Sequence, residues 1–500
     1  MTRRWPFGAL ASALVTALQL SAPASAGAQQ GWVLPPVAVS AVSGTLRSIN
    51  APDIASDAAG NAVAVWAEMD PNFRTHVMGA RFDAASETWS APRRLSDGLS
   101  TTVLEQHVVM DTAGNTLVLW SQAAGGSDWT VYSTRLLAGA STWSVPEIRS
   151  TGSASDVRLA MNAAGDAVAI WSVYGTLAPG PPPGVYAVRF AGATGIWSAA
   201  ERLGPVVQTG VPGIDVAIDG AGNLFAAWHY TAVEARRYSV TTGQWAPAVT
   251  LSGTLAMPQI GQLRPMPRLA TNSAGDAIAS WTNGGVVEVT RYQHTSDTWT
   301  PAARISSGGD DSQRGVIDAN GNVVVAWHHN AGTTRTLQAA RLDQPRTAWS
   351  APVDLAAPGA PIPLVFNYGA PAVVADPRGN VLVLASRSTD GTEVRLVSAY
   401  FVRSTATWAG ASDLSRARRD ARLPNVAMDA AGNAMAVWFE GNGATSTNQA
   451  MRWRITAGSS AVTTVEAAPG ALSVGFTTAA PADPALAPTN IEYSLSLIHI

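Results

Sequence analysis

Short apolar runs alternate with small polar turns along the chain, and the same order of runs and turns recurs eight times. Each unit reads Asp-x-x-Gly-Asn, then four mostly apolar residues, then Trp. The motif begins at positions about 53 residues apart, namely Asp57, Asp111, Asn162, Asp219, Asn272, Asp318, Asp376 and Asp429. A sequence repeat of this length indicates one supersecondary unit used many times.

A second motif, Trp-Ser-Ala-Pro or a variant of it, follows the first motif in seven of the eight units. Its tryptophans are Trp89, Trp143, Trp197, Trp245, Trp299, Trp349 and Trp408. We expect four strands in each unit. The last unit gives a first strand over 424–428 and a second over 434–439, and the first unit gives a third over 77–83 and a fourth over 89–95. The recurring tryptophans are therefore expected to belong to the core.

Four short strands in every repeat predict the blades of an all-β propeller. The eighth unit lacks a Trp-Ser-Ala-Pro strand, whereas residues 31–40, near the start of the chain, have the character of a strand without a partner. If this segment completes the last blade, the ring closes and no strand edge is left open. The sequence thus predicts an eight-bladed propeller of 32 strands over residues 31–455.

The two ends of the chain differ from the repeats. Residues 1–26 combine two early arginines, an apolar run and the small residues Ala24-Ser25-Ala26, which is typical of an export signal cleaved after Ala26. Residues 461–500 suggest strands over 461–470, 471–477 and 489–497, and stop part-way through that pattern. We therefore expect a secreted propeller, extracellular or periplasmic, that is followed by a partial second module.

Composition and charge narrow the function classes. The 500 residues include no Cys and no Lys, which excludes disulfides, thiol nucleophiles and Schiff-base lysines. The net charge of −3 provides no general basic field for nucleic acid. No segment outside the leader has the roughly 18 consecutive apolar residues that suggest a membrane span. The sequence points to no cofactor.

The Asp-x-x-Gly-Asn hairpins and the Trp-Ser-Ala-Pro strands resemble the repeats of secreted bacterial propellers of the broad sialidase-like type, with repeats similar to Asp boxes. The resemblance covers residues 31–455. The repeats depart from the Ser-x-Asp-x-Gly-x-x-Trp box of sialidases in every unit, so the resemblance implies the fold and not the activity. The tail from Val465 resembles the first half of a bacterial fibronectin type III domain.

Each hairpin keeps one carboxylate and one amide at the first and fifth motif positions. Six units have Asp then Asn, and the other two have Asn162 with Asp166 and Asn272 with Asp276. Because the order swaps as a pair, we expect the two side chains to touch or to share backbone donors. A calcium site is the alternative, although a single carboxylate per loop makes a poor cage.

The hairpins should lie at one end of the propeller, and the variable loops between second and third strands at the other, where we place the binding face. Two rings of polar positions that differ between blades point to that face. Four residues before each motif stand Asp53, His107, Arg158, Asp215, Arg268, Arg314, Ala372 and Asn425. Two residues after the motif's tryptophan, or after Ala385 in the seventh unit, stand Glu68, Gln122, Val173, Tyr230, Asn283, His329, Arg387 and Glu440.

Three arginines in the first ring suggest a site for a carboxylate or a sulfate. His107 and His329 would add charge below about pH 6 to 7, so that binding weakens as the pH rises. The alternative is that these are ordinary solvated strand ends. Glu68 and Glu440, on adjacent blades after ring closure, are a weaker candidate acid–base pair.

These observations favour a secreted, non-catalytic binding protein for a glycan, another extracellular polymer or a surface protein. The ligand-binding candidates are Arg158, Arg268, Arg314, His107, Asp53, Asp215, Glu68, Tyr230, His329, Arg387 and Glu440. Two alternatives stay open: a glycoside-processing enzyme of sialidase or lyase type, and a structural or adhesive cell-surface scaffold. An enzyme would need a nucleophile and an acid–base pair in one pocket, whereas a binder needs only a rim of polar and aromatic groups.

Overall fold

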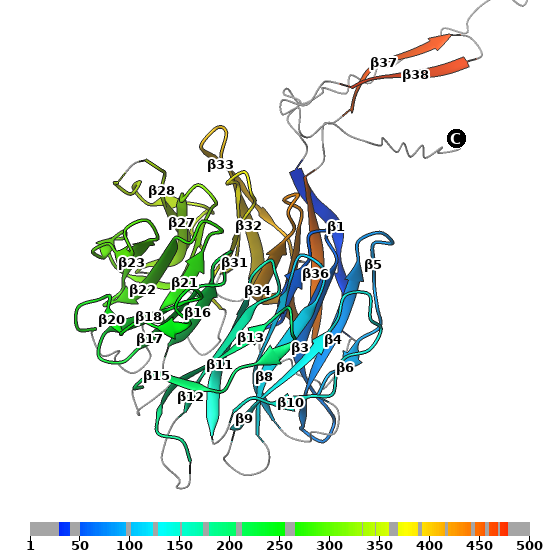
Figure 1. Ribbon diagram of the computed structural model, residues 1–500. Helices are drawn as coiled ribbons and strands as arrows, with labels where there is room; N and C mark the ends of the chain where they lie inside the picture. The colour runs from blue at the N-terminus through cyan, green and yellow to red at the C-terminus, as the bar shows by residue number, and fades with distance from the viewer. Residues whose placement is uncertain are drawn as a thin grey trace, which may run out of the picture. The chain divides into compact units, whose positions relative to one another are not determined.

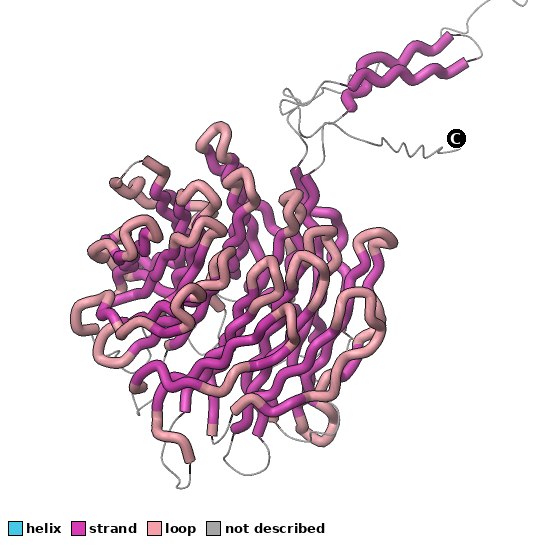
Figure 2. Tube along the Cα trace, viewed as in Figure 1, coloured by secondary structure: helices cyan, strands magenta, loops and turns pink. Residues whose placement is uncertain are grey.

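A computed structural model describes the propeller over residues 30–40, 51–96, 102–123, 129–150, 153–173, 180–206, 213–255, 266–332, 334–345, 347–359, 369–388, 393–415, 419–441 and 446–455, and the backbone of a hairpin over 460–468 and 471–478. The chain divides into a unit of residues 32–454 and a second unit formed by residues 1–31 and 455–500. Every described regular element is a strand (Figures 1 and 2). No helix among the described residues is long and apolar enough to cross a membrane.

Eight antiparallel sheets form the blades, as the repeats predict. The first strands are β2 (Asp53–Ser56), β7 (Val103–Met110), β11 (Ala154–Met161), β16 (Ile214–Ile218), β21 (Arg268–Thr271), β26 (Asp310–Ile317), β30 (Ala372–Ala375) and β34 (Asp420–Met428). Each contacts the first strands of both neighbouring blades, and β34 contacts β2 to complete the circle. These strands are therefore the innermost ones and surround the central channel.

The next two strands of each blade form long hairpins. The second strands are β3 (Ala62–Met69), β8 (Thr116–Ala123), β12 (Ala167–Val173), β17 (Leu224–His229), β22 (Ala277–Asn283), β27 (Val323–Ala331), β31 (Val381–Ser388) and β35 (Ala434–Gly441). The third strands are β4 (Thr75–Asp83), β9 (Trp129–Leu136), β13 (Gly184–Ala191), β18 (Val233–Ser239), β23 (Val286–Gln293), β28 (Thr334–Leu342), β32 (Val394–Val402) and β36 (Ser446–Ile455).

The outermost strands are short, and four of them are split in two, which corrects the prediction of one continuous strand over 89–95 and of 32 strands in all. The pieces are β5 (Thr88–Trp89), β6 (Arg93–Arg94), β10 (Glu147–Ile148), β14 (Ile196–Trp197), β15 (Glu201–Gly204), β19 (Gln244–Trp245), β20 (Val249–Thr250), β24 (Thr298–Trp299), β25 (Ala303–Arg304), β29 (Val353–Asp354) and β33 (Thr407–Asp413). In the first blade Pro92 lies between β5 and β6, and proline has no N–H to donate to the ladder.

The N-terminal strand β1 (Gln30–Ala38) pairs with β36 and completes the eighth blade, as predicted (Figure 1). The Val39 N–H donates to the carbonyl of Asn448 at 2.9 Å, and the Asn448 N–H donates to Ser40 Oγ at 2.7 Å. The Trp32 indole packs edge-on against Trp453, with ring centroids 5.4 Å apart. The two ends of the propeller sequence therefore clasp each other and close the ring.

The motif tryptophans are the core of the propeller. All seven are at most 1% exposed, namely Trp66, Trp120, Trp171, Trp228, Trp281, Trp327 and Trp438. Several of them pack against the preceding blade: Trp228 lies among Val168 and Ile170 of the third blade, and Trp66 lies beside Val437 of the eighth. Burial of such large rings between blades stabilises the ring of blades as a whole.

A recurring arginine on the third strand also connects neighbouring blades, and the sequence analysis did not predict it. Seven blades carry it at one register, two residues beyond the fifth motif position across the hairpin: Arg81, Arg135, Arg189, Arg237, Arg291, Arg341 and Arg452. Arg189 lies 4.2 Å from the ring centroid of Tyr238 in the next blade, and Arg341 lies 4.5 Å from that of Phe401. Arg452 of the eighth blade pairs with Glu87 of the first at 3.1 Å. Stacking of cations on aromatic rings therefore adds to the contacts between blades.

Beyond the propeller, β37 (Ser460–Ala468) and β38 (Ala471–Thr478) form a separate antiparallel hairpin. These bounds agree with the first two strands predicted for the tail. The export signal over residues 1–26 and the third tail strand over 489–497 lie outside the described residues.

Candidate functional site

The carboxylate and the amide of each motif hairpin bond to each other or to backbone donors of the turn, as predicted, and the fifth motif side chain also reaches the end of the third strand: Asn61 Oδ1 accepts the Ala84 N–H at 2.9 Å. Asp57 Oδ1 accepts the N–H groups of Ala59 and Asn61, both at 2.9 Å, and Asn61 Nδ2 donates to Asp57 Oδ2 at 2.7 Å. Where the order is swapped, Asn162 Oδ1 accepts the N–H of Asp166 at 3.0 Å. Gly60 and Gly321 have φ values of +84° and +78°, which glycine adopts without strain. These hydrogen bonds favour the structural interpretation over calcium binding.

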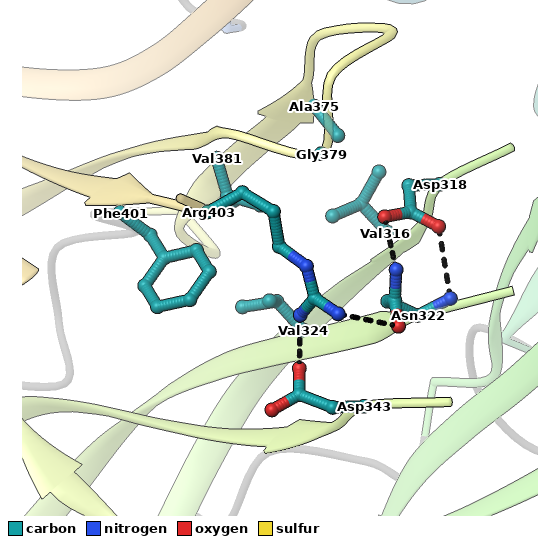
Figure 3. A pocket seen from close by; sticks show the side chains of 10 residues that line it. All are labelled: Val316, Asp318, Asn322, Val324, Asp343, Ala375, Gly379, Val381, Phe401 and Arg403. Atoms are coloured by element: carbon teal, nitrogen blue, oxygen red, sulfur yellow. Dashed lines mark hydrogen bonds and ion pairs between the residues drawn. The ribbon is translucent and has the colours of Figure 1, made fainter. Parts of the chain in front are cut away.

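A cleft at this end, between the sixth and seventh blades, is closed by its own side chains (Figure 3). The Arg403 guanidinium pairs with Asp343 and donates to Asn322 Oδ1 at 3.0 Å. Asn322 Nδ2 in turn donates to Asp318 Oδ2 at 2.6 Å. The polar groups that line the cleft thus bond to one another and link the sixth blade to the seventh.

The first predicted ring lies at one level of the channel. Each of its eight residues pairs across the hairpin with the residue that precedes the motif's tryptophan, or its equivalent Ala385. The pairs are Asp53–Val65, His107–Leu119, Arg158–Ile170, Asp215–Ala227, Arg268–Ser280, Arg314–Ala326, Ala372–Leu384 and Asn425–Val437. We call these eight first-strand residues the channel ring. The eight residues of the channel ring thus occupy equivalent positions around the channel, although their side chains differ from blade to blade.

Both aspartates of the channel ring bind the backbone of the following blade. Asp53 Oδ2 accepts the Val108 N–H at 3.0 Å, and Asp215 Oδ2 accepts the Leu269 N–H at 2.8 Å. The amide of Asn425 also donates to Asp53, across the junction between the eighth and first blades. These carboxylates therefore join blades together.

Between the two aspartates runs a network of alternating charge. His107 Nδ1 lies 3.2 Å from Asp53 Oδ2, and its Nε2 lies 3.5 Å from Glu105 Oε1. Arg158 pairs with the same Glu105 oxygen, and its Nε lies 4.0 Å from Asp215 Oδ1. The sequence analysis missed Glu105. It stands two residues before His107, and only the folded ring shows that it faces Arg158 of the next blade.

The pKa values of this network follow from burial and from its charges. Burial raises the pKa of Glu105, but Arg158, followed by His107, outweighs burial and lowers it to about 2. Burial lowers the pKa of His107, yet hydrogen bonds with Asp53 and Glu105 leave it raised. Burial likewise lowers the pKa of Arg158, but the negative charges of Glu105 and Asp215 outweigh burial and leave that pKa raised. Glu105 and Arg158 thus stabilise each other's charged forms, and the neighbouring carboxylates favour the protonated form of His107.

Arg268 and Arg314 complete the charged part of the channel ring, and they differ from Arg158. Among the described residues neither has a carboxylate within 4 Å, and the recorded contact of Arg268 is with the Met266 sulfur at 4.0 Å. Burial, then the charges of Arg314 and Arg158, lower the pKa of Arg268 to about 9. One side of the ring is neutralised and the other keeps an excess of positive charge.

Most charged members of the second predicted ring have structural partners. Glu68 Oε2 accepts the Trp66 indole N–H at 3.0 Å, and Glu440 Oε2 accepts that of Trp438 at 3.3 Å. Glu440 is fully buried, with Arg419 3.8 Å from its other oxygen. Each carboxylate of the suggested acid–base pair thus holds the tryptophan of its own blade.

The other named members of this ring lie at the ends of second strands or just beyond. His329 Nδ1 lies 2.7 Å from Asp310 Oδ1, whose side chain is fully buried. Arg387 Nη2 lies 3.3 Å from Asp413 on the outer strand of its own blade. Tyr230, in the turn after β17, is 36% exposed. The structure does not bring His329, Arg387 and Tyr230 into the network of the channel ring.

The sequence matches no known protein-family model and no curated protein. Solved structures resemble it at low identity. The NanB sialidase from Streptococcus pneumoniae is 11% identical, with a TM-score of 0.36 over 82% of this chain and 68% of that chain. A Dos1 propeller is 7% identical, with a TM-score of 0.49 over 83% and 94%. A fungal alcohol oxidase in complex with copper is 15% identical, with a TM-score of 0.40 over 69% and 73%.

These three proteins differ in kind, and their scores transfer no activity to this chain. The fold assignment follows instead from the strand pairing. No group of three or more His, Asp or Glu side chains among the described residues is placed to hold a metal ion.

Proposed function

We propose that this chain is a secreted, non-catalytic binding protein for a glycan or another extracellular polymer, which it holds at the channel ring and the surrounding loops. The observation that carries the proposal is that the acidic and the basic groups differ in whether they have partners. The carboxylates of the ring and the second-strand ends are engaged by backbone, indole or histidine groups. Two arginines at the same level have no such partner among the described residues.

Bond cleavage at this site would need a free acid and a free base or nucleophile in reach of one substrate atom. Glu68, Glu440 and Asp310 instead serve as acceptors for neighbouring groups of the fold. Binding needs only groups that can exchange water for ligand. Arg268, Arg314 and the exposed Tyr230 meet that need on a rigid set of strands.

The test is a screen of the mature protein, residues 27–500, against a glycan array and soluble polysaccharides, with product release assayed in parallel. We expect saturable binding without new reducing ends or unsaturated products. Release of such products would overturn the non-catalytic assignment in favour of the glycoside-processing alternative. Absence of binding to any polymer would favour the scaffold.

A matched pair of variants locates the binding face. Tyr230 lies in the turn after β17 and Val240 follows β18 at the opposite end of the same blade, where it is 47% exposed. Exposed aromatic residues dominate many binding sites, so Tyr230→Ala should weaken binding by about fivefold or more. Val240→Ala should leave it unchanged. The reverse result would place the ligand at the hairpin end.

A further inference from the structure

Arg268 and Arg314 lie next to each other around the channel. They stand at the same register in the fifth and sixth blades, and their strands β21 and β26 are in contact. Both side chains are half-buried. Two guanidinium groups are thus held on adjacent strands, partly removed from water.

This arrangement is costly for the free protein. Partial burial removes hydration from each cation, and the two repel each other. Arg158, which lies in the same ring, relieves its own charge through Glu105 and Asp215. Among the described residues no carboxylate lies within 4 Å of Arg268 or Arg314, and the attraction of Asp215 and Glu105 for Arg268 is weaker than its burial and the repulsion from Arg314 and Arg158. Groups that a fold leaves in this state are typical of binding sites, where the ligand supplies the missing charge.

The backbone segments that carry the two arginines are also fixed relative to each other. Gln313, which precedes Arg314, is 4% exposed, and its amide donates to the carbonyl oxygens of Met266 at 2.8 Å and Ser280 at 3.1 Å. Its side-chain oxygen accepts the Thr282 hydroxyl at 2.7 Å. These bonds reach both sides of Arg268 in the fifth blade. Gln313 therefore holds the strand of Arg314 against the blade of Arg268 and so positions the pair through the backbone.

We propose that Arg268 and Arg314 together bind the carboxylate or sulfate group of an acidic polysaccharide. The inference rests on the proposed function and names the chemistry of its ligand. A guanidinium group offers parallel N–H donors that match the oxygens of either anion, and two such groups can share one anion. Arg158 would contribute mainly its positive charge to the electrostatic potential of the site, because its Nη1 is already bonded to Glu105 and to the Val157 carbonyl.

The first experiment uses small probes, so that it does not depend on polymer binding. Galacturonic acid, sulfate and galactose are titrated into the mature protein by calorimetry or NMR. We expect both anions to bind and to weaken with added salt, and galactose not to bind. Arg268→Gln and Arg314→Gln should each lower anion affinity by about 10- to 100-fold. The control Arg93→Gln, an exposed arginine of β6, should change nothing.

The second experiment compares polygalacturonate, dextran sulfate and neutral dextran. Tighter binding of either acidic polymer, lost in both arginine variants, supports the inference, and the preferred polymer tells carboxylate from sulfate. Binding of neutral dextran that is unchanged in the variants would overturn the anion site and leave the proposed function standing. If small anions bind through the arginines but the polymers bind no more tightly than the small anions, the anion site is supported and the proposed function is overturned. No binding of any probe would overturn both.

Thermal unfolding separates a binding role from a structural one. Without ligand, Arg268→Gln removes one of two repelling cations, so the melting temperature should stay the same or rise. With saturating anion, only the wild type should gain stability. A variant that melts well below the wild type would show that Arg268 supports the fold, and rescue of anion binding by Arg268→Lys would then decide whether charge at this position still matters.

Discussion

The ion pair between Glu105 and Arg158 makes a stability prediction that can be worked out in numbers. The pKa of Glu105 falls from 4.5 to about 2 in the folded protein. One pKa unit corresponds to about 1.4 kcal/mol, so ionised Glu105 contributes about 3 kcal/mol to folding. Because the folded pKa is depressed, this contribution is fully present above about pH 4.5 and is lost as the pH falls toward 2.

Replacing Arg158 with Gln removes the group that lowers this pKa most, and leaves a partly buried carboxylate beside His107 alone. We expect the free energy of unfolding at pH 7 to fall by about 2–3 kcal/mol. The difference from the wild type should shrink near pH 3, because Glu105 of the variant, without Arg158 to lower its pKa, takes up a proton there and is no longer an unpaired charge. Urea unfolding followed by tryptophan fluorescence at the two pH values measures both quantities.

The double variant Glu105→Gln/Arg158→Gln is the control, because it removes the carboxylate that Arg158→Gln alone leaves without its arginine. It should recover most of the stability that Arg158→Gln loses at pH 7. A loss of equal size at pH 7 and pH 3, or a double variant no more stable than the single one, would refute the reasoning. Arg158 would then stabilise the ring by packing its side chain and not through the charge of Glu105.

Two further predictions concern the fold. Gly60→Val places a branched side chain at a φ of +84°, with its Cβ about 3.1 Å from Asp429 Oδ2, so urea unfolding should show a loss of about 1–3 kcal/mol, while calcium and chelator leave the melting temperature unchanged. A clear rise in melting temperature with calcium would favour a metal site in the hairpins. Deletion of residues 30–40 removes β1 and exposes the edge of β36, so the variant should aggregate or lose cooperative unfolding in size-exclusion and melting experiments. A monomeric deletion variant with an unchanged melting curve would contradict ring closure.

The blade plan could be predicted because each blade repeats the same local chemistry. The bonds of Asp57 to Ala59 and Asn61 lie within five residues, so the sequence alone could predict them. The channel ring was predictable for a related reason: polar residues that differ between blades stand out against apolar positions that repeat. Closure by residues 31–40 followed from counting strands, since the eighth unit has only three and residues 31–40 form one strand outside the eight units.

The partners of the ring residues could not be predicted, because they come from the next blade, about 50 residues away. Arg158 and Arg268 occupy equivalent positions in the sequence repeats. They differ in the folded protein, because Glu105 of the preceding blade pairs with Arg158, whereas no carboxylate among the described residues pairs with Arg268. Likewise, Glu68 and Glu440 looked like acids at a channel mouth, whereas each accepts the indole N–H of its own blade.

The third-strand arginines were visible in the sequence and were missed. Six of them, such as Arg81 before Trp89 and Arg341 before Trp349, stand eight residues before the outer tryptophan of the same unit. The arginine and the tryptophan lie on either side of the tight turn between the third and fourth strands, so their constant spacing indicates a structural role for both. It also explains part of the arginine content, because stacking on a neighbouring ring uses the flat guanidinium group, which lysine lacks.

The backbone of the first strands differs between the two ends of the channel. The first strands of the third, sixth and eighth blades bulge at one step, opposite the motif's tryptophan, and Asp156, Ser312 and Leu423 there have φ values of +50° to +57°. Each stands two residues before a member of the channel ring, so the bulge sets the direction of Arg158, Arg314 or Asn425. The hairpin end instead places glycine wherever φ is positive in the motif. Of these three positions, Ser312 stands beside Arg314, which has no carboxylate within 4 Å among the described residues, and backbone strain next to such a group is typical of a functional site.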